Sequence, residues 1–189
     1  MIQSKKELEI YLEADRIALG YTKKKPRFIH DIVWKFQILL RKCEYYINCR
    51  HDIIGKILLK ILKIRYVLLS QKLGFSIPFN VFGPGLSIAH YGMLVVHSNA
   101  KIGKNCRIHE GVTIGATGGN DCAADIGDNV FIGTGAKILG GIKIADGVAI
   151  GANAVVVKDI LEPNTTWAGV PAHKVSNNGS RKYILGRKE

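Results

Sequence analysis

Three histidines fall close together in the middle of the chain, at His90, His97 and His109. An imidazole titrates near neutrality, so each of these side chains is suited to general acid–base work on a substrate. His97 and His109 follow His90 by seven and nineteen residues, so a chain that winds in short turns would bring them onto adjoining turns. For His97 and His109, a plain surface role is an equal alternative.

Two other features that often carry chemistry are excluded by their context. The run from Gly115 to Gly119 resembles a phosphate-binding loop, but it lacks the Lys-Ser/Thr ending and the strand-to-helix setting of a nucleotide loop. The cysteines show no C-x-x-C pairing and are interpreted as free thiols, without a disulfide framework or a zinc site. They are Cys43, Cys49, Cys106 and Cys122.

The elements that position these residues are indicated by a strict repeat. An aliphatic residue recurs at every sixth position from Val96 to Val156, with one skipped beat at Asn120. Six is neither the helical nor the strand period, so the pattern marks an internal repeat. It predicts a coil with one short strand and one sharp turn per six residues, in which aliphatic side chains stack in a column. A β-sandwich would not hold this phase over ten positions.

The first 75 residues have a different hydrophobic pattern. Apolar residues at three- and four-residue spacing over 5–19 and 28–72 predict amphipathic helices, with a basic, Pro-containing linker at 23–27. This region holds 16 Lys and Arg against 7 Asp and Glu, in a chain of 189 residues with a net charge of +12. We expect a basic α-helical region at 1–75, a β-helix at 76–175 and a polar basic tail at 176–189.

The same region bears on localisation and partners. Its charged start lacks the apolar core of a signal peptide, and the apolar stretch at 53–70 is broken by four cations, so we expect a cytoplasmic protein without a spanning helix. Peripheral contact with the inner face of an anionic membrane is one interpretation of the basic helices. A solvated helical cap is the preferred one. No nucleic-acid fold signature accompanies the charge, so nucleic acid is not an expected partner.

The motifs GPGLSIAH (83–90) and WAGVPAHKV (167–175), together with the repeat between them, resemble the hexapeptide-repeat acyltransferases in their serine acetyltransferase-like branch. The resemblance covers the C-terminal half of the chain or more. It implies a left-handed parallel β-helix that forms homotrimers, or pairs of trimers, with acetyl-CoA in a groove between subunits. The family's catalytic histidine, a general base that takes the hydroxyl proton of the acceptor, falls on His90. No metal is implied.

The resemblance also implies which residues contact the two substrates. Small residues let a pantetheine arm approach the backbone, and cations hold the nucleotide phosphates. Carried over by motif, the acetyl-CoA contacts are Ala116, Thr117, Thr134, Ala152, Lys158 and Lys174. The expected acceptor contacts are His97, His109 and Asp121.

The residues expected around the acceptor differ from those at the matching positions of serine acetyltransferases. These enzymes carry Asp before the catalytic histidine, another Asp some fifteen residues upstream, and an Asp-Arg-His triplet in the following loop. The matching positions here are Ala89, Phe75 or Ser76, and residues 121–123, which read Asp-Cys-Ala. Without the arginine of that triplet, the chain lacks a bidentate contact to the carboxylate of serine. We therefore expect acetyl transfer to a sugar hydroxyl of a cell-surface polysaccharide or its precursor. Serine O-acetylation is the alternative, and a non-catalytic, basic glycan- or nucleic-acid-binding β-helix is the non-enzyme alternative.

Overall fold

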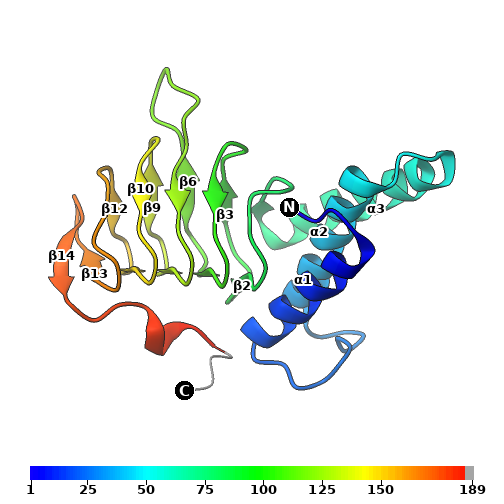
Figure 1. The fold of residues 1–189 in the computed structure, drawn as a ribbon, viewed down its shortest axis with the longest axis horizontal. Coiled ribbons are helices and arrows are strands. Elements are labelled where there is room, and N and C mark those ends of the chain that lie inside the picture. Colours follow the sequence, from blue (N-terminus) through cyan, green and yellow to red (C-terminus); the bar gives the residue numbers. More distant parts are fainter. Residues whose placement is uncertain (186–189) are drawn as a thin grey trace.

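The computed structural model describes residues 1–185, in which three helices precede a coil of short strands (Figure 1). The helices are α1 (Lys5–Ala18), α2 (Ile32–Cys49) and α3 (Ile53–Leu73). Side-chain oxygens of Ser4 and Asp52 accept backbone N–H bonds at the starts of α1 and α3, and α3 ends at Gly74 with a left-handed φ of 75°. No helix within 1–185 has the length and apolar content needed to cross a membrane. The end of the predicted tail, 186–189, lies outside the described residues.

The coil is a three-sided prism, because successive strands join three different sheets in rotation. All neighbouring strands pair in parallel except the final hairpin of β13 and β14. The first sheet holds β1 (Phe75–Ser76), β3 (Leu94–Val96), β6 (Thr113–Gly115), β9 (Lys137–Leu139) and β12 (Val155–Val156). The second holds β4 (Lys101–Ile102), β7 (Asp125–Ile126) and β10 (Lys143–Ile144). The third holds β2 (Ser87–Ile88), β5 (Arg107–Ile108), β8 (Phe131–Ile132), β11 (Ala149–Ile150), β13 (Thr166–Ala168) and β14 (His173–Ser176).

The register of the strands confirms the predicted stacking of the repeat. Ile126 pairs with Ile144, and Ile132 pairs with Ile150, each eighteen residues or three repeats later. The aliphatic residues of the series are at most 5% exposed. Burial of each such side chain stabilises the fold by about 1.5–3 kcal/mol, so the column is the principal core. The skipped beat at Asn120 lies in the loop 116–124, which protrudes beside β6 (Figure 1).

The sharp turns of the coil depend on a second sequence pattern. The third residue after many of the stacked aliphatics is Asn or Gly, and at these positions the backbone is left-handed, with φ of 55° at Asn105, 57° at Asn129 and 72° at Gly135. Only Gly, and to a lesser extent Asn, adopts this conformation readily. The Asn105 amide also donates to Oδ1 of Asn129 at 3.0 Å, which links consecutive turns.

Helix α2 closes the first turn of the coil and fixes β2. The strand β2 has a paired neighbour on one side only, β5. On its other side, the buried Gln37 amide donates to the Leu86 carbonyl at 2.7 Å and accepts from the Ile88 N–H at 3.2 Å. A side chain thus satisfies the backbone groups that an edge strand leaves open.

A buried ion network adds a second attachment between the helices and the coil. The Arg41 guanidinium contacts Asp15 at 2.8 Å and Glu44 at 3.0 Å, and also donates to the carbonyl of Phe82. Asp15 in turn accepts from the backbone N–H groups of residues 85 and 86, both at 2.8 Å. The helices therefore hold the segment that leads directly into His90.

Candidate active site

His90 lies on one edge of the prism, which is formed by the turns that follow strands of the third sheet. We call this the histidine edge and define it as residues 89–93, 109–112, 133–136 and 151–154. Its turns are joined by backbone hydrogen bonds, such as Gly135 N to Glu110 O at 2.9 Å and Asn153 N to Thr134 O at 2.8 Å. These bonds place His90, His109, Thr134 and Ala152 in successive layers of the same edge.

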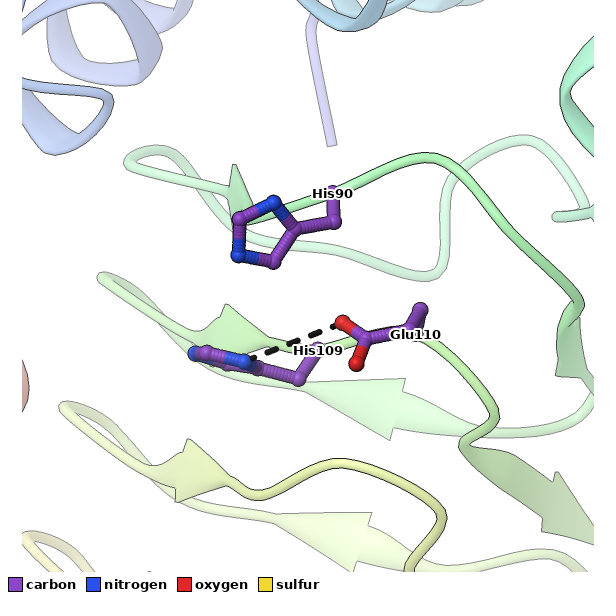
Figure 2. Close-up of side chains that lie close together, drawn as sticks. All are labelled: His90, His109 and Glu110. Atoms are coloured by element: carbon purple, nitrogen blue, oxygen red, sulfur yellow. Dashed lines mark ion pairs between the residues drawn. The ribbon is translucent and has the colours of Figure 1, made fainter.

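The side chains of His90, His109 and Glu110 form a cluster on this edge (Figure 2). The two imidazole rings meet at an interplanar angle of 72°, with centroids 5.7 Å apart. His109 Nδ1 lies 3.9 Å from Glu110 Oε2. The hydroxyl of Thr134 donates to Glu110 Oε1 at 3.0 Å. Glu110 Oε2 is buried and has no hydrogen-bond partner within residues 1–185, so one carboxylate oxygen is free to interact with the imidazoles.

Burial, hydrogen bonds and neighbouring charges shift the pKa values of His109 and Glu110 and so set their protonation states. The pKa of His109 is lowered by burial first and by the positive charge of Arg107 second, against the opposing effect of Glu110. The pKa of Glu110 is lowered by hydrogen bonds from its own backbone N–H and from Thr134, and by the two histidines. The cluster near neutral pH therefore combines a carboxylate with a neutral His109, beside the solvent-exposed His90.

A cavity of about 300 Å³ opens beside His90, between the coil and the helical region. Its lining includes Tyr21, Asp31, His90, Arg107 and Leu185, and Asp31 is paired with Lys23 and Arg27. Arg107 donates from Nη1 to Ser87 Oγ at 3.0 Å, and no carboxylate within 1–185 forms an ion pair with it. A half-buried guanidinium without an acidic partner suits a ligand that carries a carboxylate or a phosphate.

The C-terminal segment runs back from the far end of the prism toward the helices (Figure 1), and its Leu185 lines this cavity. After β14 the chain runs back along the coil, where Ser180 N donates to the Gly147 carbonyl at 2.8 Å. In the short helix η1 (Arg181–Tyr183), the Tyr183 ring stacks on Phe131 with centroids 4.6 Å apart. Phe131 also contacts the His109 ring, so the segment borders the cluster.

The remaining predicted contacts, except Lys174, fall on a second edge, formed by the turns that follow strands of the first sheet. We call this the loop edge and define it as residues 97–100, 116–124, 140–142 and 157–159. It carries Ala116, Thr117 and Lys158. On it, His97 Nε2 lies 3.6 Å from Asp121 Oδ1. Within one chain, the structure does not bring this edge to His90.

Of the predicted acetyl-CoA contacts, only Thr134 and Ala152 share an edge with His90. Both are exposed and flanked by glycines or small residues, which leaves the backbone of the turns accessible to a slender ligand. Lys174 lies on β14, away from the cluster, and forms an ion pair with Glu162. The positive charge expected beside the nucleotide phosphates is therefore sparse on the histidine edge of a single chain.

Two histidines and a glutamate are common zinc ligands, so the spacing of their donor atoms decides whether the cluster can hold an ion. One possible ligand atom of each residue lies within 4.8 Å of those of the other two, and His109 Nδ1 lies 3.9 Å from Glu110 Oε2. Ligands at zinc bond lengths lie about 3.4 Å from one another, so this arrangement is wider than a closed tetrahedral site. Binding of one ion would require the three side chains to move closer together.

Sequence reasoning did not identify Glu110, Arg107 or Gln37 as parts of the site. Glu110 directly follows His109 and Arg107 precedes it by two residues, so their proximity along the chain was an available signal. Gln37 had no such signal, because it reaches the site from a helix some fifty residues upstream.

Comparisons with known proteins bear on the repeat and on the whole fold. Residues 123–158 match the family described as "Bacterial transferase hexapeptide (six repeats)". A serine acetyltransferase of Staphylococcus epidermidis is 45% identical over 101 residues, which is 52% of this chain and 47% of that protein. The chain thus spans about half the length of the curated relatives it matches.

Solved structures extend the likeness to the helical region. The serine acetyltransferase of Neisseria gonorrhoeae is 30% identical with a TM-score of 0.68, covering 92% of this chain and 68% of that one. The serine acetyltransferase of Brucella abortus strain S19 in complex with coenzyme A is 29% identical with a TM-score of 0.68, covering 93% and 70%. A further Neisseria gonorrhoeae structure holds serine, at 29% identity and a TM-score of 0.63, covering 89% and 69%.

Proposed function

The chain belongs to the serine acetyltransferase-like branch of the hexapeptide-repeat transferases, and from this membership we propose that it is an acetyl-CoA-dependent O-acetyltransferase. The observation that carries the proposal is the cluster on the histidine edge, where an exposed imidazole lies beside a carboxylate oxygen that no donor in the described part of the chain contacts. The coenzyme A bound to the Brucella abortus relative supports acetyl-CoA as the donor. On the same ground, we infer that the prism winds left-handed.

In the proposed reaction, His90 acts as general base. It takes the proton of the acceptor hydroxyl while that oxygen attacks the thioester carbonyl, and it returns the proton to the departing thiolate. The products are an acetyl ester and coenzyme A. The negative charge of Glu110 would stabilise the imidazolium formed on His90, which supplies the carboxylate that Ala89 does not.

The two edges of the prism support a trimeric active site. Thr134 and Ala152 accompany His90, whereas Ala116, Thr117, Lys158, His97 and Asp121 lie on the loop edge. In a cyclic homotrimer, the loop edge of one subunit would face the histidine edge of its neighbour. The expected contacts to acetyl-CoA and to the acceptor would then come together between subunits.

For the acceptor, the comparisons favour serine over the sugar hydroxyl that the sequence motifs suggested. The similar proteins are named serine acetyltransferases, and one of them holds serine. Arg107 adds a physical reason, because it places in the cavity beside His90 a cation that has no acidic partner within residues 1–185, and so offers the carboxylate contact that loop residues 121–123 lack. A neutral sugar would leave this charge unused.

A sugar acceptor remains the second candidate, favoured by the absence of the Asp before His90 and of the Asp-Arg-His triplet. An acidic sugar would also satisfy Arg107. Release of coenzyme A thiol should be followed with L-serine, a neutral sugar or an acidic sugar as acceptor. Turnover with serine that falls in Arg107→Met through a raised KM supports the main proposal. Turnover with a sugar and none with serine contradicts it.

A further inference from the structure

Helix α3 has two apolar faces, and only one of them is covered. Gly55, Leu59, Leu62, Tyr66 and Leu73 are buried or half-buried and form the side that packs on the rest of the protein. On the opposite side, six aliphatic side chains are each more than half exposed: Ile53, Ile54, Ile57, Ile61, Ile64 and Leu68. At about 100° per residue, these six fall within one arc of about 100°. They therefore form a continuous stripe, which we call the α3 stripe.

Cations line both borders of the α3 stripe. The helical period places Lys56, Lys60 and Lys63 along one border, and Arg65 and Lys72 along the other. The helix contains no Asp or Glu. Long basic side chains beside an apolar face can lay their methylenes along it while their charges reach outward.

A loop extends the surface beyond the helix. Phe28, 95% exposed, lines a cavity of about 590 Å³ together with Leu68, Arg65 and Lys72. Several lysine and arginine side chains line the cavity, and within residues 1–185 no acidic residue does. Figure 1 shows α3 at the end of the molecule opposite β14, with one end projecting from the fold.

These features restrict what can cover the stripe. Monomeric proteins rarely leave a contiguous apolar surface of this kind open to water. A second α3 would bring five more cations against the first five with no carboxylate in either helix to offset them. Nucleic acid would match the charge but not the aliphatic side chains. An anionic lipid surface matches both, because acyl chains accept the aliphatics and headgroup phosphates accept the cations.

We propose that the α3 stripe, with Phe28, binds an anionic membrane surface, with α3 lying in the plane of the interface. The inference stands apart from acetyl transfer, since none of these residues belongs to the cluster at His90. It leaves the prism projecting from the lipid into water.

The test uses the full chain and vesicles of phosphatidylcholine, with or without phosphatidylglycerol, in a sedimentation assay. Binding to the mixed vesicles is expected, with little binding to phosphatidylcholine alone. Ile57→Ser/Ile61→Ser/Ile64→Ser removes part of the apolar stripe from exposed positions, and Lys56→Gln/Lys60→Gln/Lys63→Gln removes one charged border. The charge variant is expected to bind roughly a hundredfold more weakly, since each cation near an anionic surface contributes about a fivefold factor.

The matched control is Lys101→Gln/Lys104→Gln/Lys143→Gln, which removes three exposed cations from the prism. It should bind almost normally, and circular dichroism should show all variants folded. Three results would overturn the proposal: no binding to mixed vesicles, equal loss in the prism control, or an apolar variant that binds normally. Light scattering that shows the apolar variant losing an oligomer, without lipid binding in the parent, would assign the stripe to a second copy.

Discussion

The Glu110 carboxylate lies one residue after His109 and presents to that ring an oxygen, Oε2, that no donor within the described chain satisfies. Because of this relationship, the histidine edge carries a carboxylate beside imidazole rings and can take part in proton transfer. The Thr134 hydroxyl, from the next layer of the edge, donates to Oε1 of Glu110. This hydrogen bond fixes the carboxylate so that Oε2 faces the imidazoles. The cluster thus gives His90 a source of negative charge that its own turn lacks.

Glu110→Gln should lower kcat by about fivefold to about a thousandfold, because a charge pair near 4 Å contributes about 1–4 kcal/mol at a partly exposed site and 1.36 kcal/mol is a factor of ten. The KM for acetyl-CoA should change little. Initial rates at varied acetyl-CoA measure both. Glu13→Gln, an exposed change on α1, is the control and should be silent. Unchanged kcat in Glu110→Gln would remove the carboxylate from the mechanism.

His109 should titrate below an ordinary histidine, because burial and Arg107 disfavour its charged ring. Protons then bind this ring more readily in the unfolded chain, so the stability that is fully present above a pH of about 6.5 is lost as the pH falls from there through the lower pKa of the folded state. Ring chemical shifts give the pKa directly. In urea unfolding, His109→Asn should show a smaller loss of stability on acidification than the parent. An equal loss would contradict the assignment.

Arg41→Met should destabilise the fold by about 3–5 kcal/mol, because it strands the buried carboxylates of Asp15 and Glu44. Denaturant unfolding measures the change. Arg50→Met, at an exposed pair with Asp52, is the matched control and should have little effect. If both variants lost the same stability, the network would not be the attachment between helices and coil.

The proposed facing of the two edges can be tested by cross-linking. Cys122 is exposed on the loop edge, and Thr134 is exposed on the histidine edge. A short dimaleimide should convert Thr134→Cys into covalent trimers, because Cys122 of one subunit would meet residue 134 of the next. Lys104→Cys, in the turn that follows β4 and outside both defined edges, should not form them, and adding Cys122→Ser to Thr134→Cys should abolish them. Trimers from Lys104→Cys and none from Thr134→Cys would contradict the arrangement.

The stacking of the coil could be predicted from the sequence because side-chain period alone determines it, as at Ile132 and Ile150. The layer in which His90 lies could not be predicted in this way. Ile88 pairs with Ile108 twenty residues later, whereas coils without the protruding loop repeat every eighteen residues and the coil that contains the loop takes twenty-four, so the first coil is out of phase with the sixfold repeat. That offset decides that His90 meets His109 and Glu110. Helical periodicity likewise predicts that α2 buries one face, but not that Gln37 on that face bonds to β2.

The most direct measurement is the acetyl-transfer rate of His90→Ala with the acceptor found active, beside His173→Ala as a matched control on the exposed β14. A general base contributes about 10²–10⁴-fold, so His90→Ala should lose at least about a hundredfold in kcat while its oligomeric state stays that of the parent. His173→Ala should keep its rate. A folded His90→Ala protein that retained more than about a tenth of the parent kcat would contradict the account, because general-base loss costs far more than tenfold.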